Sequence, residues 1–235
     1  GETAVASVSL ANQIFFLLNL MVFGVTSGCA IFIAQLWGKK DVHNIRRVVG
    51  VTIKLALAAA LFFTVIGFFF SRSVLHIYSN DPEVIRRGSE FLRIICWTYG
   101  FFTMSIVFSM ANRSTGNVRL PLYISTSALA IEVILAIPLI FGVKWLGIPA
   151  MGINGFAWAA LAARILECGA LLFFTYKDRQ NPVRVGLAEL REWDWKFIKT
   201  ILKPVLPVIA NETLWSLGIT TYNVIYGHIG TDAVA

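Results

Sequence analysis

The sequence predicts an all-α, polytopic membrane protein built as a bundle of six transmembrane helices. Of its 235 residues, 57% are hydrophobic and only 14% are charged, and the mean hydropathy is +0.72. A soluble domain carries about 25% charged residues, so this chain lacks the polar surface to face water on every side. Long apolar runs separated by charged loops support the same prediction, because about 20 such residues span a bilayer as a helix.

The six spans follow one another along the chain, each dominated by Leu, Ile, Val, Phe and Ala. They are predicted at residues 4–37, 53–70, 97–110, 120–141, 156–174 and 205–226. The first run is longer than one span requires, so we expect this helix to tilt or to project from the bilayer. Small residues mark two helix-packing faces, a GxxxG in the first span and a ridge in the fifth. They are Gly24 and Gly28, and Gly152, Gly155, Ala159 and Ala163.

Basic residues gather in three loops that six spans would place on one side of the membrane. These loops, residues 38–47, 113–119 and 177–203, hold most of the 20 Lys and Arg residues. The positive-inside rule makes this side cytoplasmic and predicts a multi-pass protein of the cell inner membrane. The formal net charge of +7 is therefore a topology signal. We expect no nucleic-acid partner. Anionic lipid headgroups are expected to interact with the basic loops as a minor partner.

Two stretches are predicted to be helical without spanning. Residues 79–93 begin with Asn-Asp-Pro, a helix-start signal with Asp81 as the cap and Pro82 at the first helical position. This short external helix would lead into the third span. Residues 187–203 alternate apolar and charged side chains, which is typical of an amphipathic helix on the cytoplasmic leaflet. The chain is therefore divided into a first bundle at 1–176, a linker at 177–203 and a new unit at 204–235.

Enzyme and metal signatures are missing from the sequence. Cys29, Cys96 and Cys168 are isolated within apolar runs, and no Cys/His cluster suggests a disulfide framework or a metal site. There is no HExxH, no GxSxG and no phosphate-cradling GxxxxGK[ST]. We therefore expect a protein that is not an enzyme and carries no cofactor.

Five ionisable residues fall within the apolar runs. They are Lys54, Glu132, Arg164, Glu167 and Glu212. Each costs about 2.5–3.5 kcal/mol at the bilayer centre, which makes each a functional candidate. Lys54 lies close enough to the cytoplasmic end of its span to reach the interface. Arg164 and Glu167, three residues apart, form either a structural pair or a polar network whose protonation changes during a cycle.

Glu132 lies near the middle of the fourth span with no opposite charge nearby in sequence. Its helical face continues through Ser125, Ala128 and Ala136, polar and small residues that suit a cavity or close helix packing. A carboxylate without a partner at this depth can exchange protons near neutral pH. The alternative is a carboxyl group that is simply hydrogen-bonded to a neighbouring helix.

Glu212 is the second candidate ligand for a cation or a proton. It follows Pro204 and Pro207, which can loosen the first turns of the sixth span and free backbone carbonyls for ion binding. Two polar stripes supply candidate cavity-lining residues. They are Asn12 and Asn19, which continue to Thr26 at seven-residue spacing in the first span, and Ser216 and Asn223, which with Thr220 follow Glu212 in the last.

Several segments, taken in order, resemble the multidrug and toxic compound extrusion (MATE) family of transporters. They are GETAVASVSLANQ at 1–13, AQLWGKKD at 34–41, IRR at 45–47, YSNDPEV at 78–84, FLR at 91–93, NRSTGN at 112–117 with Pro121, IFG at 140–142 and GINGFA at 152–157. The resemblance implies twelve helices in two pseudo-symmetric six-helix lobes, of which this chain would supply the second to seventh. The pattern GxxAVA at 1–6 and 230–235 would then mark the start of the second helix of each lobe, and such a fragment is not expected to transport alone.

The resemblance also implies a function and site residues. Family members export organic cations or other amphiphiles in exchange for Na⁺ or H⁺. The full-length form of this protein is expected to be a monomer. Many members carry Asn-x-x-x-Asp/Asn before the IFG-like end of the fifth helix, where this chain has Glu132 and Ala136. This departure argues against proton coupling by the usual pair. Glu212 resembles the acidic residue of the seventh helix that Na⁺-coupled members use.

Three functions follow as hypotheses. The first is an antiporter that works by alternating access in a lipid bilayer, with Glu132 and Glu212 as ligands for the coupling cation or proton. The second is a lipid-linked oligosaccharide flippase of the same superfamily, which should line its cavity with more cationic residues than Arg164 alone. The third is a membrane-embedded enzyme or scaffold, which should cluster its polar residues at one membrane surface.

Overall fold

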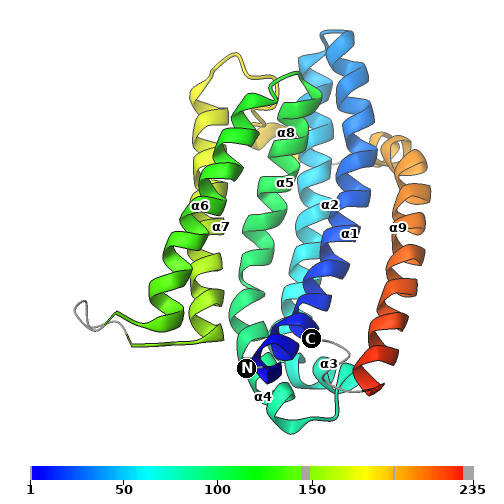
Figure 1. Cartoon of the computed structure of the whole chain (residues 1–235). Coiled ribbons are helices and arrows are strands. Elements are labelled where there is room, and N and C mark those ends of the chain that lie inside the picture. Colours follow the sequence, from blue (N-terminus) through cyan, green and yellow to red (C-terminus); the bar gives the residue numbers. More distant parts are fainter. Residues whose placement is uncertain (1, 144–148, 193, 230–235) are drawn as a thin grey trace.

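The computed structural model describes residues 2–143, 149–192 and 194–229, which form helices joined by short loops (Figure 1). The helices are α1 (Glu2–Gly38), α2 (Val42–Phe69), α3 (Ser71–Tyr78), α4 (Pro82–Ile95), α5 (Thr98–Ser114), α6 (Arg119–Phe141), α7 (Ile153–Lys177), α8 (Leu187–Arg191) and α9 (Trp195–Ile229). The second GxxAVA segment, at 230–235, and Lys144 lie outside the described residues.

The described helices confirm a multi-pass membrane bundle. Four of them, α1, α2, α6 and α7, are long and apolar enough to cross a bilayer, and α4 with α5 forms a fifth span if this pair, bent by 50°, is counted as one. Helix α1 has 37 residues, so the expectation of an overlong first span is confirmed. The sixth predicted span lies within α9, in which the side chains of several residues are not described.

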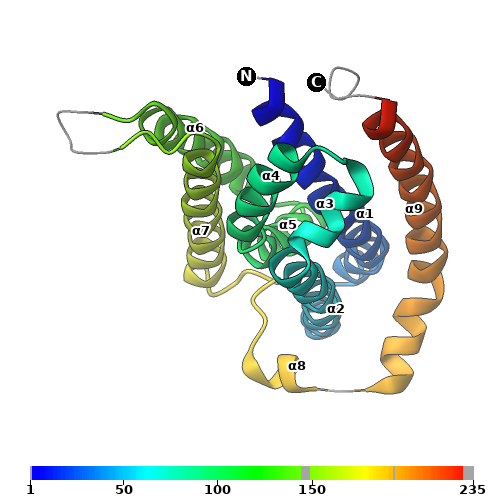
Figure 2. The same ribbon diagram turned by 90° about the horizontal axis from the view of Figure 1, so that it is seen from below.

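Helices α1, α2, α4 and α5 form the centre of the bundle, with the α6–α7 pair on one side and α9 on the other (Figure 2). One apolar cluster joins α1, α2, α5, α7 and the first turns of α9 toward the end that carries the basic loops. A second joins α1, α2, α4, α5 and α7 further along the bundle. Helix α6 packs mainly on α7, and only 11% of its most apolar stretch is buried.

Small residues bring two helix pairs close together, as the sequence predicts. A Cβ atom added to Gly28 would lie 2.6 Å from Val205 Cγ2, and one added to Gly24 would lie 3.2 Å from the Ile209 Cα. These two glycines are therefore the face of α1 on which α9 packs. Gly155 of α7 lies so close to the backbone of Leu139 in α6 that no side chain would fit there. The predicted packing face of the first span is confirmed. In the fifth span Gly155, Ala159 and Ala163 are buried as predicted, whereas Gly152 caps the start of α7 with no neighbour within 4 Å of an added Cβ atom and is not part of the packing face.

The three basic loops lie at the same end of the bundle, and α3, α4, the end of α6 and the start of α7 lie at the other (Figure 1). The predicted sharing of one side is therefore confirmed. At the opposite end α4 begins as predicted, because the Asp81 carboxylate accepts hydrogen bonds from the backbone N–H groups of Glu83 (2.8 Å) and Val84 (3.4 Å). Pro82 follows as the first helical residue, and α4 leads into α5.

The linker helix and the start of the last span differ from the prediction. Residues 187–203 were expected to form one amphipathic helix, but α8 is only five residues long and a new helix begins at Trp195. The reason is a local cap: the Asp194 carboxylate accepts the backbone N–H groups of Lys196 (2.9 Å) and Phe197 (3.2 Å). Helix α9 then continues past Pro204 and Pro207 without a break, so the expected unwound turns are absent there.

Candidate functional site

A network of ionisable side chains joins α6 to α7 inside the bundle. Arg164 Nη1 donates to Glu167 Oε2 at 2.7 Å, and Arg164 Nη2 lies 3.6 Å from Glu132 Oε2. The second oxygen of Glu167 accepts a hydrogen bond of 2.8 Å from Ser125 Oγ. The side chain of Glu167 is 6% exposed, that of Glu132 is 14% exposed and that of Arg164 is 30% exposed. The guanidinium therefore lies between two carboxylates that are largely removed from solvent.

The local sequence explains this arrangement. Arg164 and Glu167 are three residues apart and thus share one face of α7. On α6, Ser125, Ala128 and Glu132 are spaced by three and four residues, so they share the face that packs on α7. Ala128 is buried there, and the close approach at Gly155 holds the two helices together. Each helix thus supplies polar side chains to a contact formed by small residues.

The expectation that Glu132 lacks an opposite charge is wrong, because Arg164 faces it. The partner comes from the neighbouring helix, 32 residues further along the chain. Helical periodicity relates residues three or four apart and carries no information about such a contact. The alternative considered for Glu132, a carboxyl group held by a neighbouring helix, describes its surroundings better.

A cavity of about 350 Å³ opens beside this network. Its polar lining consists of Glu132, Arg164, Thr98 and the two asparagines predicted from the first span, Asn12 and Asn19. Its apolar lining comes from α1, α4 and α7: Phe15, Phe16, Ile95, Phe156 and Ala160. The site thus combines a carboxylate, amide groups and aromatic faces, a set that can hold a cation together with an apolar body.

The charge of the network is negative when all three groups are ionised, because two carboxylates face one guanidinium. The Arg164–Glu132 contact is also the longer of the two, at 3.6 Å against 2.7 Å. Arg164 lies over the Phe102 ring, 5.8 Å from its centroid, so a third contact fixes the guanidinium. Of the two carboxylates, Glu132 is the one that lines the cavity.

Glu212 is not part of this cavity. It lies on α9, three residues from both Ile209 and Trp215, whose side chains contact Gly24 and Phe16 of α1. The side chains of Ser216 and Asn223 lie outside the described part of the structure, so their assignment as cavity-lining residues stays a prediction. Lys54 reaches the basic end as expected, where its ammonium group donates to the Glu192 carbonyl at 2.7 Å.

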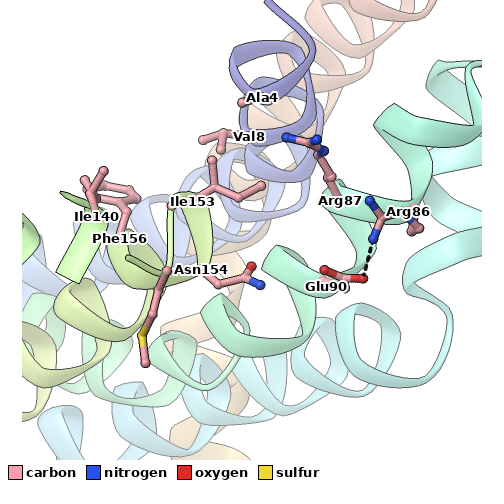
Figure 3. Close-up of a pocket in the computed structure, with 11 residues that line it drawn as sticks. Ala4, Val8, Arg86, Arg87, Glu90, Ile140, Ile153, Asn154 and Phe156 are labelled. Carbon is pink, nitrogen blue, oxygen red and sulfur yellow. Dashed lines mark hydrogen bonds and ion pairs between the residues drawn. The ribbon is translucent and has the colours of Figure 1, made fainter. Parts of the chain in front are cut away.

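A second cavity, of about 550 Å³, lies at the end opposite the basic loops (Figure 3). Arg86, Arg87 and Glu90 of α4 line one side, and Ile140, Ile153 and Phe156 line the other. Phe156 borders both cavities, and its ring is nearly parallel to that of buried Phe91, with the centroids 6.3 Å apart.

Nothing in the sequence singles out Phe156 as a residue that lines both cavities, because an aromatic residue in an apolar run is equally typical of a packed core.

Comparison with known proteins identifies similar chains. The MatE family model matches residues 1–137. The probable multidrug resistance protein YoeA of Bacillus subtilis (strain 168) is 28% identical over 100% of this chain and 50% of its own length. The probable multidrug resistance protein NorM of Thermotoga maritima is 25% identical over 99% of this chain and 49% of its own.

Solved structures share the fold. An inward-facing multidrug resistance MATE family transporter of the MOP superfamily superposes with a TM-score of 0.84 at 17% identity, over 100% of this chain and 52% of that one. This chain spans about half the length of the curated relatives it matches.

Proposed function

The chain belongs to the MatE family, and on that premise we propose that the full-length protein is a secondary active antiporter that exports organic cations or other amphiphiles in exchange for Na⁺ or H⁺. One observation carries the proposal: the cavity is lined by Glu132, by amide groups and by aromatic rings. Such a lining suits an organic cation, since the carboxylate balances the charge and the aromatic faces take up the apolar body.

Glu132 is the ligand that the substrate and the coupling ion share in this proposal. Because its contact with Arg164 is 3.6 Å long, a cation or a proton can replace the guanidinium there without breaking the shorter pair with Glu167. Two ligands that compete for one carboxylate cannot occupy it together, so binding of one favours release of the other. This competition is the exchange step that an antiporter requires.

Glu167 and Ser125 position the network. Glu167 holds Arg164 by the shorter ion pair, and Ser125 holds Glu167 from the opposite helix. Arg164 therefore stays in the site when Glu132 takes a cation. Glu212, a half-buried residue of α9, is proposed as a second cation ligand on the basis of its resemblance to an acidic residue in Na⁺-coupled members.

Substrate leaves the site in this proposal toward the end that carries the α4 helix. The 550 Å³ cavity of Figure 3 and the cavity at Glu132 share Phe156, which would separate them as a gate. The basic loops at the other end are assigned to the cytoplasm, in an inner membrane, by the positive-inside rule. The full-length protein is proposed to act as a monomer.

The flippase alternative is less favoured by the cavity. A site for an anionic lipid-linked sugar needs an excess of cationic groups, whereas here one guanidinium faces two carboxylates. The enzyme or scaffold alternative predicts polar groups at one membrane surface, whereas Glu132 lies well inside α6.

Transport by the full-length protein in proteoliposomes tests the proposal. We expect efflux of a cationic dye such as ethidium when an inward Na⁺ or proton gradient is imposed, and none without a gradient. Separate arms with Na⁺ alone and with a pH gradient alone identify the coupling ion. Translocation of a lipid-linked oligosaccharide, with no movement of any cationic dye, would assign the protein to the flippases instead.

A further inference from the structure

A third cavity, of about 570 Å³, lies at the basic end of the bundle and takes no part in the proposed transport step. It is formed by α2, the end of α7, the 178–186 loop and α8. The side chains that matter for its chemistry are Arg46, Tyr176, Arg179, Arg184 and Glu189.

The positive charge in this cavity is not balanced by the protein. None of the three arginines forms an ion pair with an acidic side chain in the described part of the chain, and Arg46 Nε is buried without a hydrogen-bond partner. The adjacent Arg47 differs, since it pairs with Glu192 at 2.7 Å and with Asp194 at 3.2 Å. A buried guanidinium nitrogen without a partner is costly, so an anion that accepts its hydrogen bond would stabilise the cavity.

The one carboxylate in the cavity is already engaged. Glu189 Oε2 accepts the backbone N–H of Gly186 at 3.0 Å, which caps the start of α8. Glu189 therefore has a structural role at the helix start. Three guanidinium groups against one carboxylate leave the cavity positively charged.

The loop that carries Arg184 is held in place before any ligand arrives. Tyr176 Oη donates to the Val185 carbonyl at 2.7 Å, and Asn181 Oδ1 accepts the backbone N–H of Val183 at 2.9 Å. Val183 and Val185 are both buried, so Arg184 is presented between two anchored residues. Asn181 also donates to Asn112 of α5 at 3.2 Å. A preorganised arginine loses less conformational entropy when it binds an anion.

We propose that this cavity binds a phosphate group, supplied by the headgroup of an anionic phospholipid. Arginine recognises phosphate through paired N–H donors, and several arginines around one cavity are the usual arrangement. The cavity lies at the ends of two membrane-spanning helices, on the side with the basic loops, where basic pockets between helices bind anionic headgroups. The inference does not depend on transport.

The test uses the full-length protein in detergent, with phosphatidylglycerol, phosphatidylcholine and inorganic phosphate added in separate titrations that follow thermal unfolding. The variant is R46Q/R184Q, and the matched control is R113Q/R119Q. The control removes two charges at the same end of the bundle from exposed residues that do not line the cavity.

We expect phosphatidylglycerol, but not phosphatidylcholine, to raise the Tm of the wild type and of the control. R46Q/R184Q should bind phosphatidylglycerol about 30-fold more weakly, the loss of two basic contacts at a headgroup. An equal loss of phosphatidylglycerol affinity in both double variants would contradict binding in the cavity and would indicate a diffuse effect of surface charge. If inorganic phosphate raised the Tm with the same affinity as phosphatidylglycerol, the proposal that a lipid supplies the phosphate group would be wrong.

A single substitution keeps the inference testable if R46Q/R184Q does not fold. Arg179 is exposed, so R179Q leaves the packing intact while it removes one charge from the cavity. It should weaken phosphatidylglycerol binding about fivefold, the loss of one such contact. Unchanged binding in R179Q, with R113Q as its control, would also contradict the proposal.

Discussion

Replacing Arg164 by Met tests whether the charged network is held together by its guanidinium. The substitution keeps an unbranched side chain of similar reach but leaves Glu167, which is 6% exposed, without its 2.7 Å partner. Breaking a buried ion pair from one side costs about 3–5 kcal/mol, because the remaining charge stays buried. Ser125 still donates one hydrogen bond to Glu167 and Arg164 is 30% exposed, so we expect the lower end, about 3 kcal/mol.

A second substitution separates this effect from loss of packing. In R164M/E167M both members of the 2.7 Å pair are removed, so the only charge that loses a partner is Glu132, through its longer 3.6 Å contact, and its side chain is more exposed than that of Glu167. Replacing a buried pair by apolar side chains of similar volume is often neutral or stabilising. We therefore expect the double variant to recover most of the stability that R164M loses.

The assay is reversible unfolding of the full-length protein in mixed micelles, and the single variant E167M completes the double-mutant cycle. The reasoning would be refuted by a double variant less stable than R164M, since the two substitutions would then act as independent packing losses. If R164M lowered the free energy of unfolding by less than about 1 kcal/mol, the pair would behave as a solvent-screened surface contact, which would also contradict the reasoning.

Three further predictions follow from other contacts. Gly28→Ala places a Cβ atom 2.6 Å from Val205 Cγ2, so it should cost about 1–3 kcal/mol by overpacking, and the added substitution Val205→Ala should recover part of that loss in the same unfolding assay. The pKa of Asp194 is lowered, first because its carboxylate accepts the backbone N–H of Phe197 and further by Arg47. The ionised form thus favours the folded start of α9, and this stabilisation is present above the ordinary value of 3.8 and is lost as the pH falls through the lower folded-state value. Pepsin cleavage between residues 191 and 198 should increase as the pH falls through that range, whereas Asp194→Asn should be cleaved to the same extent throughout; a pH-independent wild type would contradict the cap. Phe156→Ala should widen the passage between the two cavities and raise the efflux of a bulky cation relative to a small one, and an unchanged ratio would remove Phe156 as the gate.

Local patterns predicted much of the fold because they reflect interactions between residues close in sequence. The Asp81–Pro82 start of α4 and the apolar length of α1 are of this kind. Spacing alone also placed Arg164 beside Glu167, and it selected Asn12 and Asn19, which line the cavity.

Contacts between distant segments could not be predicted in this way. The pairing of Glu132 with Arg164 depends on how α6 packs against α7. The break between α8 and α9 depends on Asp194, whose carboxylate caps the start of α9. The apolar pattern continues through this stretch and therefore predicts one uninterrupted helix.

The central claim, that Glu132 is the cation ligand in the cavity, is tested most directly by dye efflux in Glu132→Gln. Glu212→Gln is measured beside it, and Asp178→Asn serves as the control, since this exposed carboxylate accepts the backbone N–H of Gln180 and lies outside the cavity. Removing the charge from a ligand that binds a cation costs about 1.5–3 kcal/mol, so Glu132→Gln should weaken the apparent affinity for the dye roughly 10- to 100-fold, with Asp178→Asn unchanged. Efflux and dye affinity at the wild-type level in Glu132→Gln would contradict this claim, and the same result in Glu212→Gln as well would remove both proposed ligands.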